Sequence, residues 1–524
     1  MKRKVGKKAL VSSLAAITLF TGLAVPYNAF ADNAPVNNAT TVNQNISDFN
    51  LPAPKHFITD HETTINGNKI EYQVDAGETY LYNLKGQPTA SMFSYSYIKK
   101  GNDENRPVLF IFNGGPGSPS FWLQMGIYGP RKVQMSNDVN PKVTPPFPVI
   151  ANENSLLDVA DLVFIDPIGT GYSKTIGVGK DSDFFGVDED ADSIAQFIET
   201  WLTKNGRWNS PKYLSGESYG SKRAAVLSNA LMGGPLSSSG VLRGISLNGI
   251  ILLGTIMKDT NPGDLMASAL NLPVQASTAW YHKVSGYQNL TLANLDEKAY
   301  KFAKNVYYPA IVKEKESKLS AKERKTIINE LTKYTGLPES VFKKSIVLSN
   351  DEYSKQVLAK TKKNVGIYDS RYTLPSVGAG FDPVADDPAM GQYSPAFIAA
   401  FHQMEKSDLG VNMDRPYNTL VWKDLNFGWN NQRKTLIPKS DNYANELAEA
   451  MRRNPDLKVM VASGYYDMGT TQASARNAFE ESATPKDRVF FKNYESGHML
   501  YIGQSADQFS KDAHEFIKNG TATK

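Results

Sequence analysis

The chain has 524 residues, of which 41% are hydrophobic and 21% are charged. This length and composition allow a large buried core, which excludes a peptide hormone, a lone binding module and a globally disordered protein. The formal net charge is +4, but the first 31 residues carry five Lys or Arg and no acid, and subtracting those five leaves −1. A nearly neutral protein gives no reason to predict nucleic-acid binding. Cysteine is absent, which excludes disulfides, thiolate catalysis and Cys-based zinc sites.

The amino-terminal segment has the pattern of a secretory signal peptide. A basic start is followed by an apolar run from Ala9 to Val25 and by the small-x-small sequence Ala29-Phe30-Ala31. The alternative, a retained transmembrane anchor, fits less well because the run is short and interrupted, and no later segment has the roughly 18 apolar residues of a spanning helix. We therefore predict residues 1–31 to be a signal peptide cleaved near Ala31, with no stable membrane insertion. An exported chain without cysteine suggests a bacterial secreted enzyme.

Residues 32–55 are rich in Asn, Ala, Thr and Pro without any period, and we interpret them as a flexible leader. Short alternating stretches follow at residues 69–74, after an Asn66-Gly67 turn signal, and at residues 90–98. These patterns are typical of antiparallel strands and hairpins.

Short apolar runs that end in glycine-rich turns dominate the next part of the chain. Such runs fit strands that are buried on both faces of a mostly parallel sheet. A helical pattern at residues 188–203 places Ile194, Phe197, Ile198 and Trp201 on one face. The alternation of strands and helices predicts an α/β fold with helices on both faces of the sheet. The apolar runs are 107–112, 162–165, 213–214, 249–253 and 458–462.

Between residues 258 and 445 the strand signal fades, and residues 294–363 combine many Lys and Glu residues with helical spacing of apolar ones. We interpret residues 258–445 as a mostly helical cap insertion with a solvated, charged outer face. The catalytic domain then comprises residues 56–257 and 446–524, and it closes with an amphipathic helix near 506–518.

The strongest local motif is Gly216-Glu-Ser-Tyr-Gly220, which follows an apolar strand and precedes a helix-forming segment. It matches the G-x-S-x-G nucleophile elbow, a tight strand-to-helix turn that lifts the serine Oγ clear of the sheet. Ser218 is therefore the predicted nucleophile.

A serine nucleophile needs a base to take its proton and a carboxylate to orient that base. Of six histidines, only His498 lies in a loop after the last apolar strand; the others lie in or near the leader, in the cap or on the final helix. We predict Asp467 as the acid because it follows the carboxyl end of an apolar strand, whereas Asp456 and Asp487 have the sequence context of surface or capping residues. The order Ser218, Asp467, His498 is that of the α/β hydrolases.

A glycine-rich loop, Asn113-Gly-Gly-Pro-Gly117, follows another apolar strand. Consecutive glycines let the main chain approach a substrate, so this loop can supply N–H donors for an oxyanion hole; a plain Gly-Pro turn is the alternative. No phosphate loop or metal cluster stands out, and Asp188-Glu-Asp190 is typical of charge at a helix start. We therefore predict no metal and no cofactor.

These motifs together resemble the serine carboxypeptidase family. The Asn-Gly-Gly-Pro-Gly loop, Gly-Glu-Ser-Tyr, Ser463-Gly-x-x-Asp and Gly497-His-Met occur in the family's order and with similar separations. Residues 158–173 also resemble the family's stretch between the loop and the elbow. The resemblance covers both halves of the catalytic domain and is weak in the cap.

The resemblance implies an α/β-hydrolase fold and a role for each motif residue. A glutamate can donate a hydrogen bond to a carboxylate only while it is protonated, because two negative charges would otherwise meet in a poorly solvated pocket. Exopeptidase activity should therefore favour acidic pH. The implied roles are a triad of Ser218, Asp467 and His498, an oxyanion hole from the N–H groups of Gly115 and Tyr219, and binding of the substrate carboxylate by Asn113 and Glu217.

Three positions depart from the family pattern. Ile111 stands where a tryptophan is usual, Ile127 where a second glutamate would share a proton with the first, and Ser118 where a cysteine is usual. The first two changes weaken the expected carboxylate site. Arg223, one helical turn beyond the nucleophile, could supply a replacement cation or could simply be a surface residue.

The main prediction is a secreted serine carboxypeptidase that releases C-terminal residues from peptides with a free C-terminus through an acyl-enzyme. An esterase or acyltransferase on the same fold is the runner-up, because fold alone does not determine function. A non-catalytic extracellular binding protein is the third alternative. Side-chain preference and oligomeric state stay open.

Overall fold

The computed structural model of the protein describes residues 49–101, 103–136, 139–140, 144–259 and 263–521. The predicted signal peptide and most of the predicted leader lie outside these residues. Within the described ranges, no helix has the length and apolar character needed to cross a membrane.

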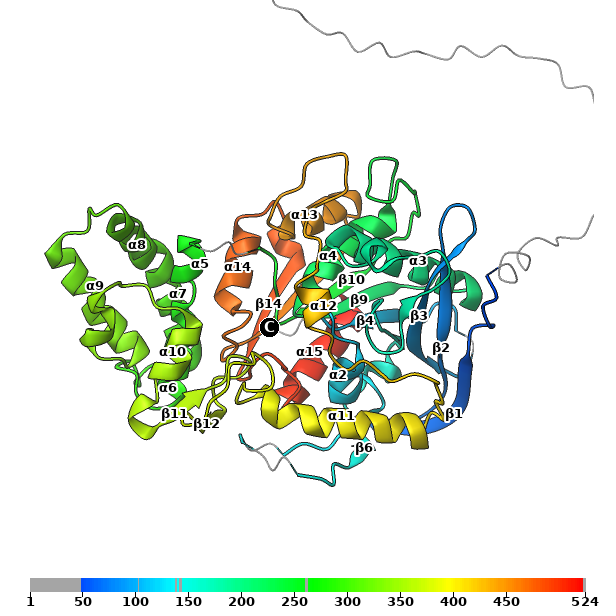
Figure 1. Ribbon diagram of the computed structural model, residues 1–524, viewed down its shortest axis with the longest axis horizontal. Coiled ribbons are helices and arrows are strands. Elements are labelled where there is room, and N and C mark those ends of the chain that lie inside the picture. Colours follow the sequence, from blue (N-terminus) through cyan, green and yellow to red (C-terminus); the bar gives the residue numbers. More distant parts are fainter. Residues whose placement is uncertain (1–48, 102, 137–138, 141–143, 260–262, 522–524) are drawn as a thin grey trace, which may run out of the picture. The chain divides into compact units, whose positions relative to one another are not determined.

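One large sheet organises the described residues (Figure 1). Its ten strands are β1 (His56–Ile65), β2 (Asn68–Tyr82), β3 (Pro88–Lys99), β4 (Val108–Phe112), β7 (Asp161–Ile165), β8 (Lys174–Thr175), β9 (Lys212–Glu217), β10 (Gly249–Leu253), β13 (Lys458–Gly464) and β14 (Val489–Tyr494). Two smaller sheets pair β5 (Arg131–Val133) with β6 (Val149–Ala151), and β11 (Lys363–Val365) with β12 (Thr373–Pro375).

The strand order is β1-β2-β3-β7-β4-β9-β10-β13-β14, with β8 paired to β3. The strands from β7 to β14 in this order are mutually parallel, and β1, β2 and β3 join them as an antiparallel meander. All five apolar runs that predicted parallel strands lie in this sheet. The Asn66-Gly67 turn connects β1 and β2 as predicted. The mostly parallel sheet is therefore confirmed.

Helices pack on both faces of the sheet because its central strands are apolar on both sides. Leu109 and Ile111 of β4 lie in one core cluster, while Phe110 lies in the other, as the alternation of side chains along a strand requires. One face carries α3 (Val187–Asn205), α4 (Tyr219–Met232), α13 (Ala444–Arg453) and α14 (Gln472–Glu480). The other carries α2 (Phe121–Leu123), α11 (Met390–Ser407) and α15 (Ser505–Asn519).

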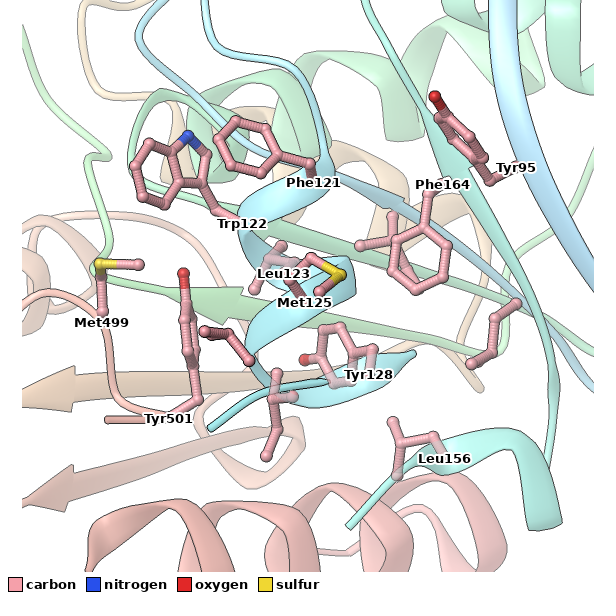
Figure 2. Packing of buried hydrophobic residues seen from close by; sticks show 14 of the residues in the cluster. Tyr95, Phe121, Trp122, Leu123, Met125, Tyr128, Leu156, Phe164, Met499 and Tyr501 are labelled. Atoms are coloured by element: carbon pink, nitrogen blue, oxygen red, sulfur yellow. The ribbon is translucent and has the colours of Figure 1, made fainter. Parts of the chain in front are cut away.

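Figure 2 shows the core on the α2 face, where aromatic and aliphatic side chains from strands, from α2 and from the π-helical turn η1 (Gln124–Tyr128) pack together. Tyr95 and Phe164 come from neighbouring strands, and Phe121 and Met125 come from the helical segment. A helix as short as α2 is not stable on its own, so burial of its side chains stabilises it.

Between β10 and β13 the chain forms a helical region with a core of its own. The Ser320 hydroxyl accepts the Glu323 amide proton and the Glu323 carboxylate accepts the Ser320 amide proton, a capping box at the start of α9. Ile311, Ile327 and Leu331, from the predicted helical pattern, are buried in this separate core. The helices of this region are α5 (Leu265–Ala269), α6 (Leu272–Tyr281), α7 (Leu292–Phe302), α8 (Tyr308–Lys315), α9 (Ala321–Thr335) and α10 (Asn350–Gln356). The short α12 (Lys423–Asn426) lies in the later connection between α11 and α13.

Single turns of other helix types complete the described structure. They are η2 (Leu156–Asp158), η3 (Asp181–Asp183), η4 (Ala303–Tyr307), η5 (Glu339–Lys343), η6 (Ala359–Thr361) and η7 (Lys486–Arg488).

The stretch after β7 positions α2. Asp166 accepts a hydrogen bond from the amide of Ser120, the residue that precedes α2, at 2.9 Å. The Ser173 hydroxyl donates to the Asp166 carbonyl at 2.6 Å and accepts from the Phe93 amide at 2.7 Å. The stretch therefore ties β3 to the start of α2, which in turn supports the glycine loop described below.

Asp166 should make the stability of the protein depend on pH. Burial raises the pKa of Asp166 to about 7, whereas an aspartate in an unfolded chain titrates near about 3.9. Between these values the folded protein holds a proton that the unfolded chain has lost, so the free energy of unfolding falls as pH rises, by at most about 1.4 kcal/mol per pH unit. We expect Asp166→Asn to reduce this slope in urea titrations between about pH 4.5 and 7.

The exposed Asp487 offers a matched control, because Asp487→Asn removes a carboxylate from a surface turn. For Asp487→Asn, the free energy of unfolding should change with pH as steeply as it does for the wild type. If Asp166→Asn also leaves the slope unchanged, Asp166 is not a neutral buried acid.

Candidate active site

Ser218 lies in the turn between β9 and α4, at the carboxyl edge of the sheet. Its backbone has φ 61° and ψ −127°, a strained conformation that costs a residue with a side chain about 1–3 kcal/mol. The turn is so tight that a Cβ on Gly216 would lie 2.1 Å from the carbonyl oxygen of Gly220. This is the geometry of a nucleophile elbow, in which the serine side chain is lifted off the sheet.

Asp467 and His498 form a buried hydrogen-bonded pair. The Asp467 Oδ1 atom accepts from the amides of Gly469 and Thr470, each at 2.9 Å, and Oδ2 lies 2.8 Å from His498 Nδ1. Because a carboxylate only accepts hydrogen bonds, Nδ1 carries the proton and Nε2 keeps its lone pair in the neutral ring. Burial lowers the pKa of His498, but the charge and hydrogen bond of Asp467 outweigh burial and raise the pKa above its ordinary value.

Ser218 and His498 line the same cavity, which has a volume of about 820 Å³. The Nε2 atom of His498 lies 3.9 Å from Oε1 of Glu217, the residue directly before Ser218. Gly254 permits this approach, because a Cβ at that position would lie 2.8 Å from the His498 ring. The structure thus brings the three residues of the predicted triad to one site from distant parts of the chain.

The glycine loop lies directly against the elbow. A Cβ on Gly114 would lie only 2.5 Å from the amide nitrogen of Tyr219, and Gly115 has φ +104°. Tyr219 is the first residue of α4, so its amide has no carbonyl within the helix to bind. Gly115 lines the cavity beside Ser218. The two residues implied as oxyanion donors are therefore close together, one on each of two touching backbones.

Asn113 and Glu217 also meet as the resemblance implied. The Asn113 amide donates to Glu217 Oε2 at 3.1 Å, and Asn113 Oδ1 accepts the amide of Leu123, in α2, at 3.2 Å. Burial raises the pKa of Glu217 to about 7, although His498 and the hydrogen bond from Tyr501 oppose the rise. The side chain is therefore neutral in acidic solution, as donation to a carboxylate requires.

Tyr501 is a site residue that sequence reasoning missed. Its hydroxyl donates to Glu217 Oε2 at 2.9 Å. Its only sequence signal is its place three residues after His498. Trp122 and Met499 were missed as well; both line the cavity, but an apolar residue in a sequence looks the same whether it lines a core or a pocket.

Two of the three departures from the family pattern lie in the core. Ile111 and Ile127 are both fully buried in the hydrophobic cluster on the α2 face, and neither lines the cavity. Ser118, by contrast, does line the cavity.

Both interpretations of Arg223 are wrong. It is almost fully buried, with 1% of its surface exposed, and it does not line the cavity. Its Nε atom donates to Asp190 Oδ2 at 2.6 Å, and its guanidinium also donates to the carbonyl of Asn113. Arg223 therefore supports the glycine loop from behind.

The acidic run from Asp188 to Asp190 lies in the first turn of α3, as predicted. Each acid has a cationic partner: Asp188 pairs with Arg433, Asp190 with Arg223, and Glu189 with Lys434. Among the residues that the structure describes, no group of three or more His, Cys, Asp or Glu could hold a metal ion.

A long connection between α11 and α13 crosses the glycine loop. Val421 donates its amide proton to the Gly117 carbonyl at 2.9 Å, and the Asn426 side chain donates to the Gly115 carbonyl at 3.2 Å. These contacts hold the connection against the glycine loop.

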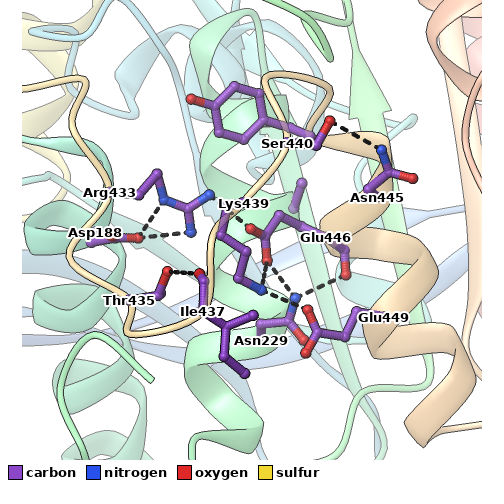
Figure 3. A network of polar contacts seen from close by, with 12 residues as sticks. Asp188, Asn229, Arg433, Thr435, Ile437, Lys439, Ser440, Asn445, Glu446 and Glu449 are labelled. Atoms are coloured by element: carbon purple, nitrogen blue, oxygen red, sulfur yellow. Dashed lines mark hydrogen bonds and ion pairs between the residues drawn. The ribbon is translucent and has the colours of Figure 1, made fainter. Parts of the chain in front are cut away.

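Farther along, the same connection is anchored by ion pairs (Figure 3). Arg433 bridges Asp188 and Glu446 at 2.8 and 2.7 Å, and Lys439 contacts Glu446 at 3.2 Å. These residues line a second cavity of about 250 Å³, whose charged groups are paired with one another. The network holds the connection onto α3 and α13.

The helical region contributes a segment, residues 367–371, which we call the clamp. The clamp binds the loop that carries Asp467: the Ile367 carbonyl accepts the Met468 amide proton at 2.9 Å, and the Ser370 amide donates to the Tyr466 carbonyl at 2.9 Å. These two bonds flank Asp467 in the chain.

The clamp also binds the loop that carries His498. The His498 amide donates to the Tyr368 carbonyl at 2.7 Å, and the two rings meet edge to face, with centroids 5.3 Å apart. Arg371 donates to the Glu495 carbonyl at 2.8 Å while it pairs with Asp369 at 2.6 Å. One short segment therefore holds the acid and the base loops together.

The fold and the elbow define an α/β hydrolase: a mostly parallel sheet, helices on both faces and a serine at a strand-to-helix turn. The crystal structure of Kex1, a prohormone-processing carboxypeptidase from Saccharomyces cerevisiae, matches with a TM-score of 0.50 over 86% of this chain and 92% of that chain, at 17% identity. That likeness concerns the fold. The family model described as serine carboxypeptidase matches residues 73–507, so the chain belongs to the serine carboxypeptidase family.

Curated relatives match over shorter stretches. Serine carboxypeptidase-like 5 of Arabidopsis thaliana is 29% identical over 148 residues, which is 27% of this chain and 32% of the relative. The pheromone-processing carboxypeptidase kex1 of Sclerotinia sclerotiorum is 30% identical over 177 residues, 30% of this chain and 26% of the relative. The aligned stretches thus span about a third of these relatives or less.

Loss of the Arg371 side chain should loosen the clamp. Arg371→Ala leaves the buried Asp369 without its cation, which should lower the free energy of unfolding by about 3–5 kcal/mol. Misplacement of His498 should also slow labelling of the protein by a fluorophosphonate serine probe by about tenfold or more. Urea unfolding and time-resolved labelling at a temperature where the variant is folded measure the two effects.

Lys301→Ala is the control, because it removes an exposed ion pair with Glu297 on α7. It should change the free energy of unfolding by less than about 1 kcal/mol and leave labelling unchanged. Equal labelling rates for folded Arg371→Ala and the wild type would show that the clamp does not position His498.

Proposed function

We propose that the chain is an exported serine carboxypeptidase that releases C-terminal residues from peptides through an acyl-enzyme. One observation carries the proposal: Ser218, His498, Asn113 and Glu217 line one cavity. A nucleophile, a base and a neutral acid that can recognise a carboxylate are thus within reach of one peptide end. Membership of the serine carboxypeptidase family supports the same chemistry.

In the first half of the reaction, His498 Nε2 takes the Ser218 proton as Oγ attacks the scissile carbonyl carbon. The amides of Gly115 and Tyr219 donate to the oxyanion of the tetrahedral intermediate. The imidazolium, stabilised by Asp467, then gives its proton to the nitrogen of the departing residue. In the second half, His498 activates a water molecule that hydrolyses the acyl-enzyme.

The terminal carboxylate of the substrate binds Asn113 and protonated Glu217. Glu217 donates its proton to the carboxylate, so the buried site holds one negative charge instead of two. The carboxylate site adjoins the nucleophile in the chain, since Glu217 directly precedes Ser218. This spacing places the last peptide bond, rather than an internal one, at the nucleophile.

The proposal includes export from a bacterial cell. The basic start, the apolar run and Ala29-Phe30-Ala31 support a signal peptide cleaved near Ala31. The absence of cysteine supports a bacterial origin. The catalytic domain would then comprise residues 56–257 and 446–524, with the helical cap at residues 258–445.

Ser218→Ala should abolish covalent labelling by a fluorophosphonate and lower peptide hydrolysis by about 10³-fold or more, because the nucleophile is lost. Ser228→Ala is the matched control, since Ser228 lies on α4 with its hydroxyl bound to the Ala225 carbonyl. It should label and hydrolyse like the wild type. Persistent labelling of Ser218→Ala, measured by mass spectrometry, would identify a different nucleophile.

Binding of peptides with a free C-terminus should weaken as Glu217 loses its proton. Since Glu217 must be protonated and its pKa is about 7, KM for a free-acid peptide should rise about tenfold per pH unit above about pH 7. In Glu217→Gln the amide group donates at every pH, so this alkaline limb should disappear, with weaker binding throughout. Steady-state kinetics on one peptide between about pH 4.5 and 8.5 test this.

The C-terminally amidated twin of that peptide serves as the control, because it carries no terminal charge. The wild type should prefer the free acid strongly at acidic pH. Equal rates on the two peptides, together with rapid ester cleavage, would instead indicate an esterase or acyltransferase.

A further inference from the structure

Tyr501 is held rigidly beside Glu217. It lies in the loop between β14 and α15, and only 5% of its surface is exposed. Its ring packs so closely on Gly126 that a Cβ there would lie 2.3 Å from two ring carbons. The Phe397 ring also lies beside it, with ring centroids 6.4 Å apart. Figure 2 shows the Tyr501 hydroxyl directed between Trp122 and Met499, both of which line the cavity.

The two carboxyl oxygens of Glu217 have different surroundings. Oε2 accepts from both the Tyr501 hydroxyl, at 2.9 Å, and the Asn113 amide, at 3.1 Å. Oε1 accepts no hydrogen bond from any residue of the described ranges, and it lies 3.9 Å from His498 Nε2. In a neutral carboxyl group the carbonyl oxygen is the better acceptor, so when Glu217 is protonated the doubly hydrogen-bonded Oε2 is the carbonyl oxygen and the proton belongs on Oε1.

We propose that Tyr501 is a positioning residue for carboxylate recognition: by donating to Oε2 it directs the Glu217 proton to Oε1, the oxygen that a substrate carboxylate can reach. The inference rests on the proposed function, since it concerns how Glu217 presents its proton to a peptide C-terminus. It also explains how the site operates with Ile127 at the position of the second glutamate. A phenol hydroxyl, which stays protonated, replaces a shared carboxyl proton.

The role of Tyr501 has a second consequence, because a hydrogen bond to an anion favours the anion. Tyr501 therefore lowers the pH at which Glu217 ionises while it orders the proton below that pH. The other ionisable groups around Glu217 are His498, which favours its ionisation, and Asp467, which opposes it. Tyr128 of η1 and Tyr368 of the clamp also face it, but burial raises both of their pKa values, so they stay neutral.

Tyr501→Phe should reveal the two effects separately, because it weakens substrate binding at acidic pH but extends activity to higher pH. At about pH 5 Glu217 is protonated in both proteins, and loss of proton ordering should raise KM for a free-acid peptide about threefold to tenfold. The alkaline limb of kcat/KM should move upward by roughly one pH unit, because the anion has lost a donor. Hydrolysis of the amidated twin should change less than twofold, since it does not use Glu217 as a donor.

Tyr494→Phe is the matched control. Tyr494 is another buried tyrosine of the same region whose hydroxyl donates to a carboxylate, that of Asp512, at 2.8 Å. A structural loss in this region should lower stability in both variants, but only Tyr501→Phe should move the limb. An unmoved limb in folded Tyr501→Phe would overturn the inference.

If Tyr501→Phe does not fold, 3-fluorotyrosine incorporated at position 501 keeps the shape of the ring. Its more acidic hydroxyl is a stronger donor, so the limb should move downward; an unchanged limb contradicts the inference. Failure of the proposed function is distinguishable, because the wild type itself would then show no preference for the free acid over the amide.

Discussion

The site depends on a close approach between two stretches of backbone at the carboxyl ends of β4 and β9. The two strands pair in register up to Phe112 and Gly216, and the segments that follow them contact each other. No side chain fits where Gly114 lies against the amide of Tyr219. This contact brings together Gly115 and Tyr219, the residues proposed as oxyanion donors, and it brings Asn113 to Glu217. The same pair of strands therefore positions both the proposed oxyanion hole and the proposed carboxylate site.

The protonation states of Glu217 and His498 are coupled. The carboxylate of Glu217 raises the pKa of His498, and His498 lowers that of Glu217. The two groups lie 3.9 Å apart in a buried site, so the protonation of one depends on that of the other. In the proposed mechanism, a neutral Glu217 binds the substrate carboxylate and also lets His498 release its proton more easily. One proton on Glu217 would thus affect both substrate binding and the base.

Sequence patterns predicted the fold and led to the candidate site residues for a physical reason. The strands are buried on both faces, so they read as uninterrupted apolar runs, and the elbow needs glycines at fixed places around Ser218. Tyr501 and Arg223 carry no such signal. Each acts through contacts with residues far away in the chain: Tyr501 binds Glu217, and Arg223 binds Asp190 and the Asn113 carbonyl. A pattern along the chain cannot reveal which distant group a buried polar side chain meets.

Two parts of the helical region contribute to the site in different ways. The clamp, residues 367–371, is hydrogen-bonded to the loops of Asp467 and His498, so a change there alters the geometry of the base. The rim of the cavity is different: Val377 and Phe381 line it with 79% and 99% of their surfaces exposed. Side chains with so few contacts can change at little cost in stability. In the proposed enzyme, the rim can therefore vary with the substrate residues that the cavity accepts, while the clamp, only a few residues away, holds Asp467 and His498 in place.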